Sequence, residues 1–183
     1  SGKRGGRFDI AATFRKSAPT ALWRMQLNVS CAGVSIFARR AMKISAVIIT
    51  LNEAANLPRC LASLADVVDE VVVLDSFSTD ATMQLAGAAG ARVAQHAFDG
   101  YGPQKRRAVA LAGGDWILSI DADEELSPAL RASILALKSR GGAAQAYAFN
   151  RLTFYCGRPV RHGGWYPDRL VRLWHRAAGN ISA

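Results

Sequence analysis

The residues best suited to chemistry in this sequence are two aspartates separated by a single residue, Asp121 and Asp123. They stand at the end of an apolar run, Trp116 to Asp121, whose composition is typical of a strand buried on both faces. A hard divalent cation such as Mg²⁺ or Mn²⁺ takes one or two carboxylates and fills its remaining positions with diphosphate oxygens. The pair therefore predicts a site in which one carboxylate faces a metal and the other faces a sugar hydroxyl.

Two further polar clusters follow apolar runs of the same kind. Thr50, Asn52 and Glu53 follow one run, and Asp75 ends the next. In an open α/β sheet, ligands bind outside the carboxyl ends of the strands, so all three clusters are expected to meet at one edge. Acidic groups around an anionic phosphate require a cation between them, which again favours a divalent metal.

Other acidic residues nearby have a simpler interpretation. Glu124 and Glu125 precede a predicted helix, and acids in such positions commonly offset the helix dipole while they remain in solvent. Asp80 is interpreted as a first-turn acid in the same way. Asp75 suits a ligand contact and a loop-capping role equally well, and the sequence leaves both open.

Strands and helices that could position these residues alternate along the chain. Apolar runs predict strands over residues 44–50, 70–75, 92–96, 116–121, 146–154 and 169–174. Apolar spacings of three and four, together with turn residues, predict helices over residues 54–65, 78–89, 103–112 and 128–139. This alternation predicts an α/β domain with a parallel sheet covered by helices on both faces.

Composition excludes several other classes of protein. Half of the 183 residues are hydrophobic and 20% are charged, which excludes a disordered tail, a collagen-like fibre and a disulfide-stapled miniprotein. The three cysteines have no metal-type or redox-type spacing and favour a reducing compartment. No glycine-rich phosphate loop follows the first buried strand, which argues against dinucleotide and P-loop sites.

The net charge of +9 is distributed unevenly. Residues 1–41 carry eight Lys and Arg against one acid, residues 42–150 carry nine against twelve, and residues 151–183 carry six against one. A mildly acidic centre between two basic ends is not the surface of a nucleic-acid-binding protein. We interpret residues 1–41 as a disordered leader or as sequence upstream of a start at Met42. Because the chain begins with Ser1, we expect it to be a fragment or a processed form.

Three segments together resemble the family 2 glycosyltransferases of the GT-A fold: ISAVIITLNEAANLPRCLASL, DEVVVLDSFSTDAT and GYGPQKRRAVALAGGDWILSIDADE. The resemblance covers about residues 43–176 and is greatest to the branch that adds glucose or a similar sugar to the lipopolysaccharide inner core. It implies a Rossmann-like, mostly parallel sheet of the nucleotide-diphospho-sugar transferases. It also implies a nucleoside-diphosphate sugar donor, Mg²⁺ or Mn²⁺ as cofactor, and inversion at the anomeric carbon.

The resemblance also assigns roles to individual residues. It places Thr50, Asn52 and Glu53 on the first nucleotide-contacting loop, Asp75 in contact with the nucleobase, and Lys105 near the nucleotide. It also makes Asp121 and Asp123 the DxD pair, with Asp123 as the metal ligand. The chain departs from the family at Phe77, where the motif DSGSTD usually has a glycine that permits a positive φ.

Fewer residues match the family on the side of the site that would bind the acceptor. The family's catalytic base lies toward the C-terminus, and the nearest candidate here is Asp168, which suits an ion pair with a neighbouring arginine better. We therefore interpret residues 42–183 as a family 2 domain that is truncated at its C-terminus, with the base beyond the chain end. Trp165, Tyr166 and Trp174 beside six arginines fit an anionic, amphipathic acceptor at a membrane surface and fit ordinary packing equally well.

The resulting hypothesis is a metal-dependent inverting transferase that moves a sugar to a lipopolysaccharide-core or other lipid-linked saccharide. The resemblance implies a cytoplasmic enzyme with peripheral contact at the inner face of the cytoplasmic membrane, and no nucleic-acid partner. One alternative is a sugar-phosphate nucleotidyltransferase, although the glycine-rich and basic first loop of that class is missing. The other is a non-catalytic module that binds nucleic acid or an anionic membrane through the basic ends.

Overall fold

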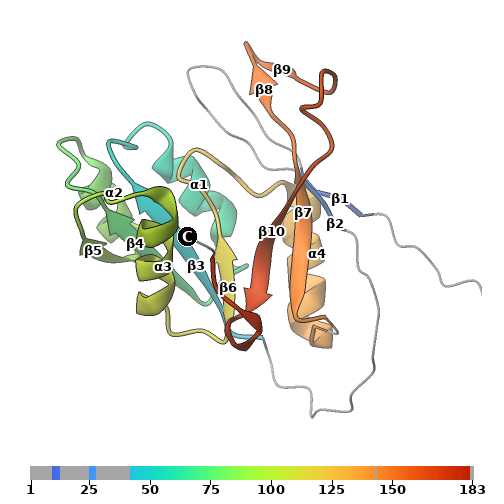
Figure 1. Ribbon diagram of the computed structural model, residues 1–183, viewed down its shortest axis with the longest axis horizontal. Helices are drawn as coiled ribbons and strands as arrows, with labels where there is room; N and C mark the ends of the chain where they lie inside the picture. Colours follow the sequence, from blue (N-terminus) through green and yellow to red (C-terminus); the bar gives the residue numbers. More distant parts are fainter. Residues whose placement is uncertain (1–9, 13–24, 28–41, 143, 182–183) are drawn as a thin grey trace, which may run out of the picture.

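The computed structural model describes residues 10–12, 25–27, 42–142 and 144–181. Most of the 1–41 segment, interpreted above as a leader, lies outside the described residues. The two parts of it that are described are β1 (Ile10–Ala12) and β2 (Met25–Leu27), which pair antiparallel. β1 lies beside helix α4 and β2 lies beside strand β7 (Figure 1).

A six-stranded sheet forms the centre of the domain, with the strand order β5-β4-β3-β6-β10-β7 (Figure 1). Its strands are β3 (Ile44–Thr50), β4 (Glu70–Asp75), β5 (Arg92–Gln95), β6 (Trp116–Ser119), β7 (Ala146–Arg151) and β10 (Asp168–His175). The first four are parallel, whereas β10 runs antiparallel to both β6 and β7. The mostly parallel α/β sheet predicted from the sequence is confirmed.

Helices cover both faces of this sheet, as expected. The helices are α1 (Leu57–Leu64), α2 (Thr82–Ala88), α3 (Tyr101–Leu111) and α4 (Pro128–Arg140). Apolar residues of α1, α2 and α4 pack in one core cluster with alternate strand residues such as Ala46 and Ile48. α3 packs on the opposite face, where Ala108 and Val109 contact the set that includes Val47.

The element boundaries differ from the predicted ones mainly at the carboxyl edge of the sheet. β3 and β4 have the predicted bounds, because continuous apolar runs define them. Helix α2 begins at Thr82 rather than at residue 78, because Ser78 and Thr79 bond to other loop residues. α4 begins as predicted, with Ser127 Oγ accepting a hydrogen bond of 3.1 Å from the amide of Leu130.

A hairpin replaces the last part of the strand predicted over residues 146–154. β7 ends at Arg151, and β8 (Phe154–Tyr155) then pairs antiparallel with β9 (Arg158–Pro159). The hairpin projects beyond the edge of the sheet at which β6 ends (Figure 1). Among the described residues, no helix has the length and apolar character needed to cross a membrane.

Gly114 allows the turn before β6 to approach the start of β3 closely. A Cβ at this position would lie 2.6 Å from Ser45 Oγ and 2.7 Å from the Lys43 carbonyl oxygen. We expect Gly114→Ala to lower the free energy of unfolding by about 1–3 kcal/mol, because the backbone must move to relieve the overlap. Chemical denaturation measures this, with Gly113→Ala as the control, since its Cβ would meet only the flexible Glu70 carboxylate at 3.4 Å. Equal losses in the two variants would contradict the packing argument.

Candidate functional site

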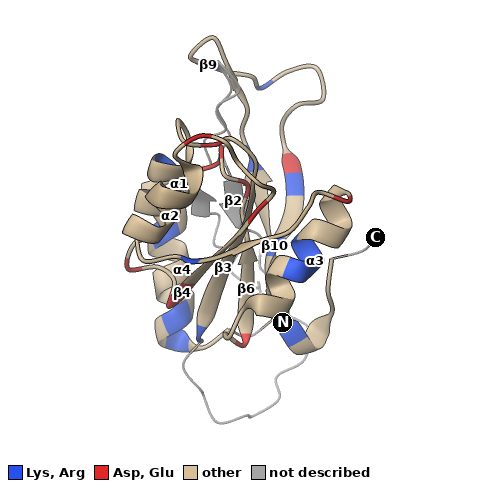
Figure 2. Cartoon of the chain, turned by 90° about the vertical axis from the view of Figure 1, so that its left-hand side faces the viewer, with Lys and Arg blue, Asp and Glu red and all other residues tan. Residues whose placement is uncertain are grey.

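The three polar clusters predicted from the sequence meet at the carboxyl edge of the parallel strands. Thr50 and Asp75 are register partners at the ends of β3 and β4, and β6 lies on the other side of β3. Acidic segments gather in the loops above these strands (Figure 2). The structure therefore brings together the residues that the motifs had placed on separate loops.

Hydrogen bonds join the loop after β3 to the loop after β4. The amide of Asn52 donates to Ser78 Oγ at 2.8 Å, and Asn52 Oδ1 accepts from the amide of Thr79 at 2.8 Å. The amide of Glu53 donates to Thr82 Oγ1, also at 2.8 Å. Asn52 and Glu53 are thus held in place by the neighbouring loop without any ligand.

Asp80 takes part in the same joint between the loops rather than acting only as a first-turn acid. Its Oδ2 accepts from the amide of Ala54 at 3.0 Å, and its Oδ1 accepts from the amide and the hydroxyl of Thr82. The hydrogen bond from the Thr82 hydroxyl is the main cause that lowers the pKa of this exposed carboxyl. Asp80 therefore fixes the distance between the two loops.

Asp75 is fully buried at the end of β4 and organises the second loop. Its Oδ1 accepts from Thr50 Oγ1 at 2.8 Å, and its Oδ2 accepts from the amide of Ser78 at 2.8 Å and from Gln95 Nε2 at 3.4 Å. Burial raises the pKa of this carboxyl, but hydrogen bonds from Ser78, Thr50 and Gln95 more than offset that effect, so the pKa lies below its usual value. This geometry supports the loop-capping role, while a contact with a nucleobase stays a prediction.

Phe77 keeps the backbone conformation that glycine would provide in the family motif. It has a φ of 61°, and the residue is 56% exposed. A positive φ is rare and costly for an aromatic residue. The second loop therefore has a positive-φ turn despite the substitution, with an aromatic side chain directed toward solvent.

Asp121 lies between two cations. Lys105 Nζ, from α3, is 2.6 Å from its Oδ1, and Arg172 Nη2, from β10, is 3.2 Å from its Oδ2. Lys105 and Arg172 therefore balance the negative charge of the Asp121 carboxylate. This ion pair holds Lys105 beside the turn, while its predicted contact with a nucleotide stays a prediction.

Glu124 is fully buried, so the expectation that it faces solvent as a helix-dipole partner is wrong. Its Oε1 lies 2.8 Å from Arg172 Nη2, and its Oε2 accepts a hydrogen bond of 3.1 Å from the amide of Asp121. Burial raises the pKa of Glu124 to about 7, although Arg172 favours the ionised form. Glu125 is only partly exposed and pairs with Arg59 at 3.0 Å.

Asp123 lies between Asp121 and Glu124 on the same turn and is partly exposed. Its carbonyl oxygen accepts from Arg59 Nη2 at 3.3 Å. Among the described residues there is no group of three or more His, Cys, Asp or Glu side chains that could hold a metal ion. One carboxylate together with diphosphate oxygens and water is a ligand set that Mg²⁺ or Mn²⁺ accepts, so the turn fits a metal, and Asp123 as its ligand stays a prediction.

The acceptor-side candidate, Asp168, begins β10 opposite Arg151 of β7. Its Oδ2 lies 2.7 Å from Arg151 Nε, which is the ion pair that the sequence favoured. Together with Gly163, Gly164 and Trp165, these two residues line a hollow of about 230 Å³. Arg151 also lies 3.9 Å from Glu124, so the hollow adjoins the Asp121–Asp123 turn.

The two tryptophans near the C-terminus have different environments. Trp165 is 54% exposed beside the hollow, whereas Trp174 is buried against the α3 face of the sheet. The membrane interpretation of Trp174 is therefore wrong, because its ring packs in the core. For Trp165, a contact with an acceptor stays a prediction.

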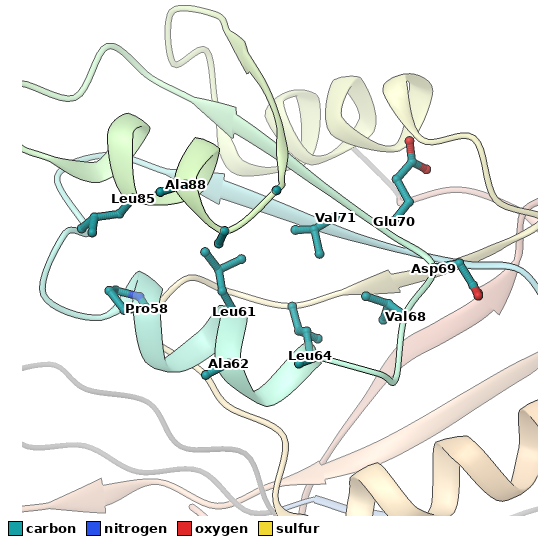
Figure 3. Close-up of a pocket in the computed structure, with 13 residues that line it drawn as sticks. Pro58, Leu61, Ala62, Leu64, Val68, Asp69, Glu70, Val71, Leu85 and Ala88 are labelled. Carbon is teal, nitrogen blue, oxygen red and sulfur yellow. The ribbon is translucent and has the colours of Figure 1, made fainter.

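A second hollow, of about 590 Å³, lies away from all of these residues (Figure 3). It is mainly apolar, and Leu61 and Leu64 of α1 face Leu85 and Ala88 of α2 across it. It reaches Glu70 at the amino end of β4, which is the edge of the sheet opposite the acidic loops. It is therefore separate from the candidate site.

The model of the family described as "Glycosyl transferase family 2" matches residues 45–182. The chain therefore belongs to glycosyl transferase family 2, which confirms the enzyme class and the GT-A fold class expected from the motifs.

Individual proteins agree with this assignment. An uncharacterized glycosyltransferase of Rickettsia felis is 52% identical over 92 residues, which cover 50% of this chain and 32% of that protein. The lipopolysaccharide core biosynthesis glycosyltransferase LpsC of Rhizobium meliloti is 41% identical over 143 residues, covering 75% of this chain and 53% of that protein. The matched part of the chain thus spans about a third of the Rickettsia protein and about half of LpsC.

Two solved structures are similar over about half of the chain. Glucosyl-3-phosphoglycerate synthase from Mycobacterium tuberculosis, crystallised with Mn²⁺, UDP and glucosyl-3-phosphoglycerate, is 38% identical, with a TM-score of 0.40. The match covers 44% of this chain and 33% of that one. TarS 1–349 of S. aureus is 28% identical, with a TM-score of 0.47, over 54% of this chain and 33% of that one.

The low pKa of Asp75 predicts a specific dependence of stability on pH. A carboxyl whose pKa is lower in the folded protein stabilises it fully above the unfolded pKa, which is about 3.9. This contribution is then lost as the pH falls through the folded value. We expect Asp75→Asn to be about 1–3 kcal/mol less stable than wild type at pH 7, because one of the two acceptor oxygens becomes an amide nitrogen and the donors that it held lose their partner. The difference should shrink below about pH 4.

Denaturation from pH 7 to pH 2 measures this difference, with Asp66→Asn, at an exposed aspartate, as the control. A difference between wild type and Asp75→Asn that stays constant with pH would contradict the assigned role of the carboxylate.

Proposed function

We propose that this chain forms the donor-binding part of a metal-dependent, inverting glycosyltransferase. The donor would be a nucleoside-diphosphate sugar, and the acceptor a lipopolysaccharide-core or other lipid-linked saccharide. The observation that carries the proposal is the Asp121–Asp123 turn, which stands at the carboxyl edge of a family 2 sheet, where Lys105 and Arg172 balance the charge of Asp121. The similarity to LpsC supports the acceptor class.

Within this proposal the donor-side residues have distinct roles. Asp123 would hold Mg²⁺ or Mn²⁺, which when bound neutralises charge on the diphosphate leaving group. Lys105 brings a positive charge to the same place, and Asp121 holds it there at 2.6 Å while facing the donor sugar. The pocket for the nucleoside would be formed or supported by Thr50, Asn52, Glu53 and Asp75, in loops that hydrogen bonds join to each other. Such preorganisation lowers the ordering cost of binding.

On the acceptor side, the hollow beside Trp165 adjoins the donor turn through Arg151 and Glu124. A base there would take the proton of the acceptor hydroxyl as that oxygen attacks the anomeric carbon. Asp168 is the candidate base within this chain, and Arg151 holds its carboxylate at the wall of the hollow.

We further propose that the protein acts in the cytoplasm at the inner face of the membrane. Family membership favours sugar transfer over the nucleotidyltransferase and the binding-module alternatives.

The metal assignment predicts the behaviour of Asp123→Asn, a change of charge at constant shape. A thermal-shift panel of UDP, GDP, ADP and CMP, each with and without Mn²⁺, should show metal-dependent stabilisation of wild type by one of the nucleotides. Ligand at 100 times its Kd stabilises by about 2.7 kcal/mol. In Asp123→Asn the metal-dependent part should vanish while the stability of the ligand-free protein is kept.

Asp115→Asn, at the amino end of β6, is the matched control and should behave as wild type. Unchanged metal-dependent binding by Asp123→Asn would remove Asp123 from the metal site. A wild type that binds no nucleotide with Mn²⁺ would contradict the proposed function.

The role of Asp168 is tested by Asp168→Asn with a deacylated core-oligosaccharide acceptor. If Asp168 is the base, turnover should fall by about 10²–10⁴-fold while nucleotide binding is unchanged. Asp99→Asn, which changes an exposed ion pair with Arg107, is the control. Turnover of Asp168→Asn close to that of wild type would leave the carboxylate with only its structural ion pair.

A further inference from the structure

A buried ion pair lies directly beneath the Asp121–Asp123 turn, and none of the sequence motifs indicated it. Arg172 and Glu124 are both almost completely buried, and Arg172 Nη2 lies 2.8 Å from Glu124 Oε1. The two residues come from segments 48 positions apart in the chain. We propose that Arg172 and Glu124 are positioning residues, which hold the Asp121–Asp123 turn in the conformation that binds the metal and the donor diphosphate.

Glu124 acts on the turn through both of its oxygens. Its Oε2 accepts from the amide of Asp121, which closes the turn on one side of Asp123. The backbone adds a second closure, since the amide of Glu124 donates to the Asp121 carbonyl oxygen at 3.0 Å. Asp123 is therefore held between two residues that are bonded to each other.

Arg172 acts on the same turn from the opposite side. One guanidinium nitrogen contacts both carboxylates, Asp121 at 3.2 Å and Glu124 at 2.8 Å, and the other donates to the Ser119 carbonyl oxygen at 3.5 Å. The guanidinium thus spans the end of β6 and the turn that follows it. A planar guanidinium can make these contacts at once, whereas a lysine ammonium is a single point charge.

An irregularity in β10 falls at Arg172. The register of β10 with β7 shifts between Val171 and Leu173, so Arg172 is the extra residue of a β-bulge. Bulges redirect a side chain and are frequent beside active sites. The three consecutive residues from 172 to 174 are all buried.

The stability of the fold alone does not require a buried ion pair between Arg172 and Glu124. Replacing a buried ion pair by apolar residues of similar size is often neutral for folding, whereas removal of one partner is strongly destabilising. The paired change Glu124→Met with Arg172→Met therefore separates folding from positioning. Removing outer partners of metal ligands typically weakens metal binding by 10–100-fold.

The test rests on the proposed function and uses the whole 183-residue chain. Mn²⁺ is titrated by electron paramagnetic resonance with the nucleotide that gives the largest shift in the thermal panel. We expect the double Met variant to unfold cooperatively and to bind Mn²⁺ about 10–100-fold more weakly than wild type, with its metal-free nucleotide affinity within about threefold. Arg172→Lys keeps the charge and should show an intermediate loss.

The control removes an ion pair at the opposite edge of the sheet, through Lys138→Met with Asp69→Asn, and should bind Mn²⁺ as wild type does. A folded double Met variant with wild-type Mn²⁺ affinity would overturn the positioning role and leave the proposed function intact. Should that variant not fold, wild-type affinity in Arg172→Lys overturns it equally. Absence of Mn²⁺-dependent nucleotide binding in the wild type contradicts the proposed function itself, and with it this inference.

Discussion

Neutralisation of buried negative charge is the constraint on which the candidate site depends. Glu124 is fully buried and Asp121 is partly buried next to it, so two carboxylates share a small volume at the end of β6. Ionised carboxylates are stable in such a place only with nearby cations and hydrogen bonds. Arg172 meets both carboxylates from one side, and Lys105 meets Asp121 from the other. In the proposed function, Asp123 of the same turn would hold the metal.

Hydrogen bonds join the two loops at the same edge of the sheet. Asn52, Glu53 and Ala54 donate their amides to side chains of the loop after β4, and buried Asp75 ties that loop to Thr50. Hydrogen bonds of this kind fix the two loops relative to each other, so a nucleotide would meet a formed pocket. The hollow beside Trp165 adjoins this edge from the strands β7 and β10, which places the proposed acceptor beside the proposed donor.

The sequence predicted the features that depend on residues close together in the chain. Continuous apolar runs predicted β3 and β4 to the residue, and the polar residues after them predicted which loops meet. The expectation that Glu124 faces solvent was wrong, because its position just before a helix is typical of an exposed acid. Its buried partner, Arg172, is 48 residues away in the chain. The bulge that directs Arg172 inward depends on pairing with β7, which strand periodicity does not reveal. A lone arginine within the apolar run LVRLW was the available signal.

Paramagnetic broadening by Mn²⁺ tests the location of the metal–nucleotide site most directly. The experiment records amide spectra of the ¹⁵N-labelled chain with the bound nucleotide and a small fraction of Mn²⁺. We predict the strongest loss of signal at residues 121–125, and a weaker loss at residues 50–54. Residues 85–90, beside the hollow at the other edge of the sheet, should keep their intensity. Broadening centred on residues 85–90, or no localised broadening, would contradict the account.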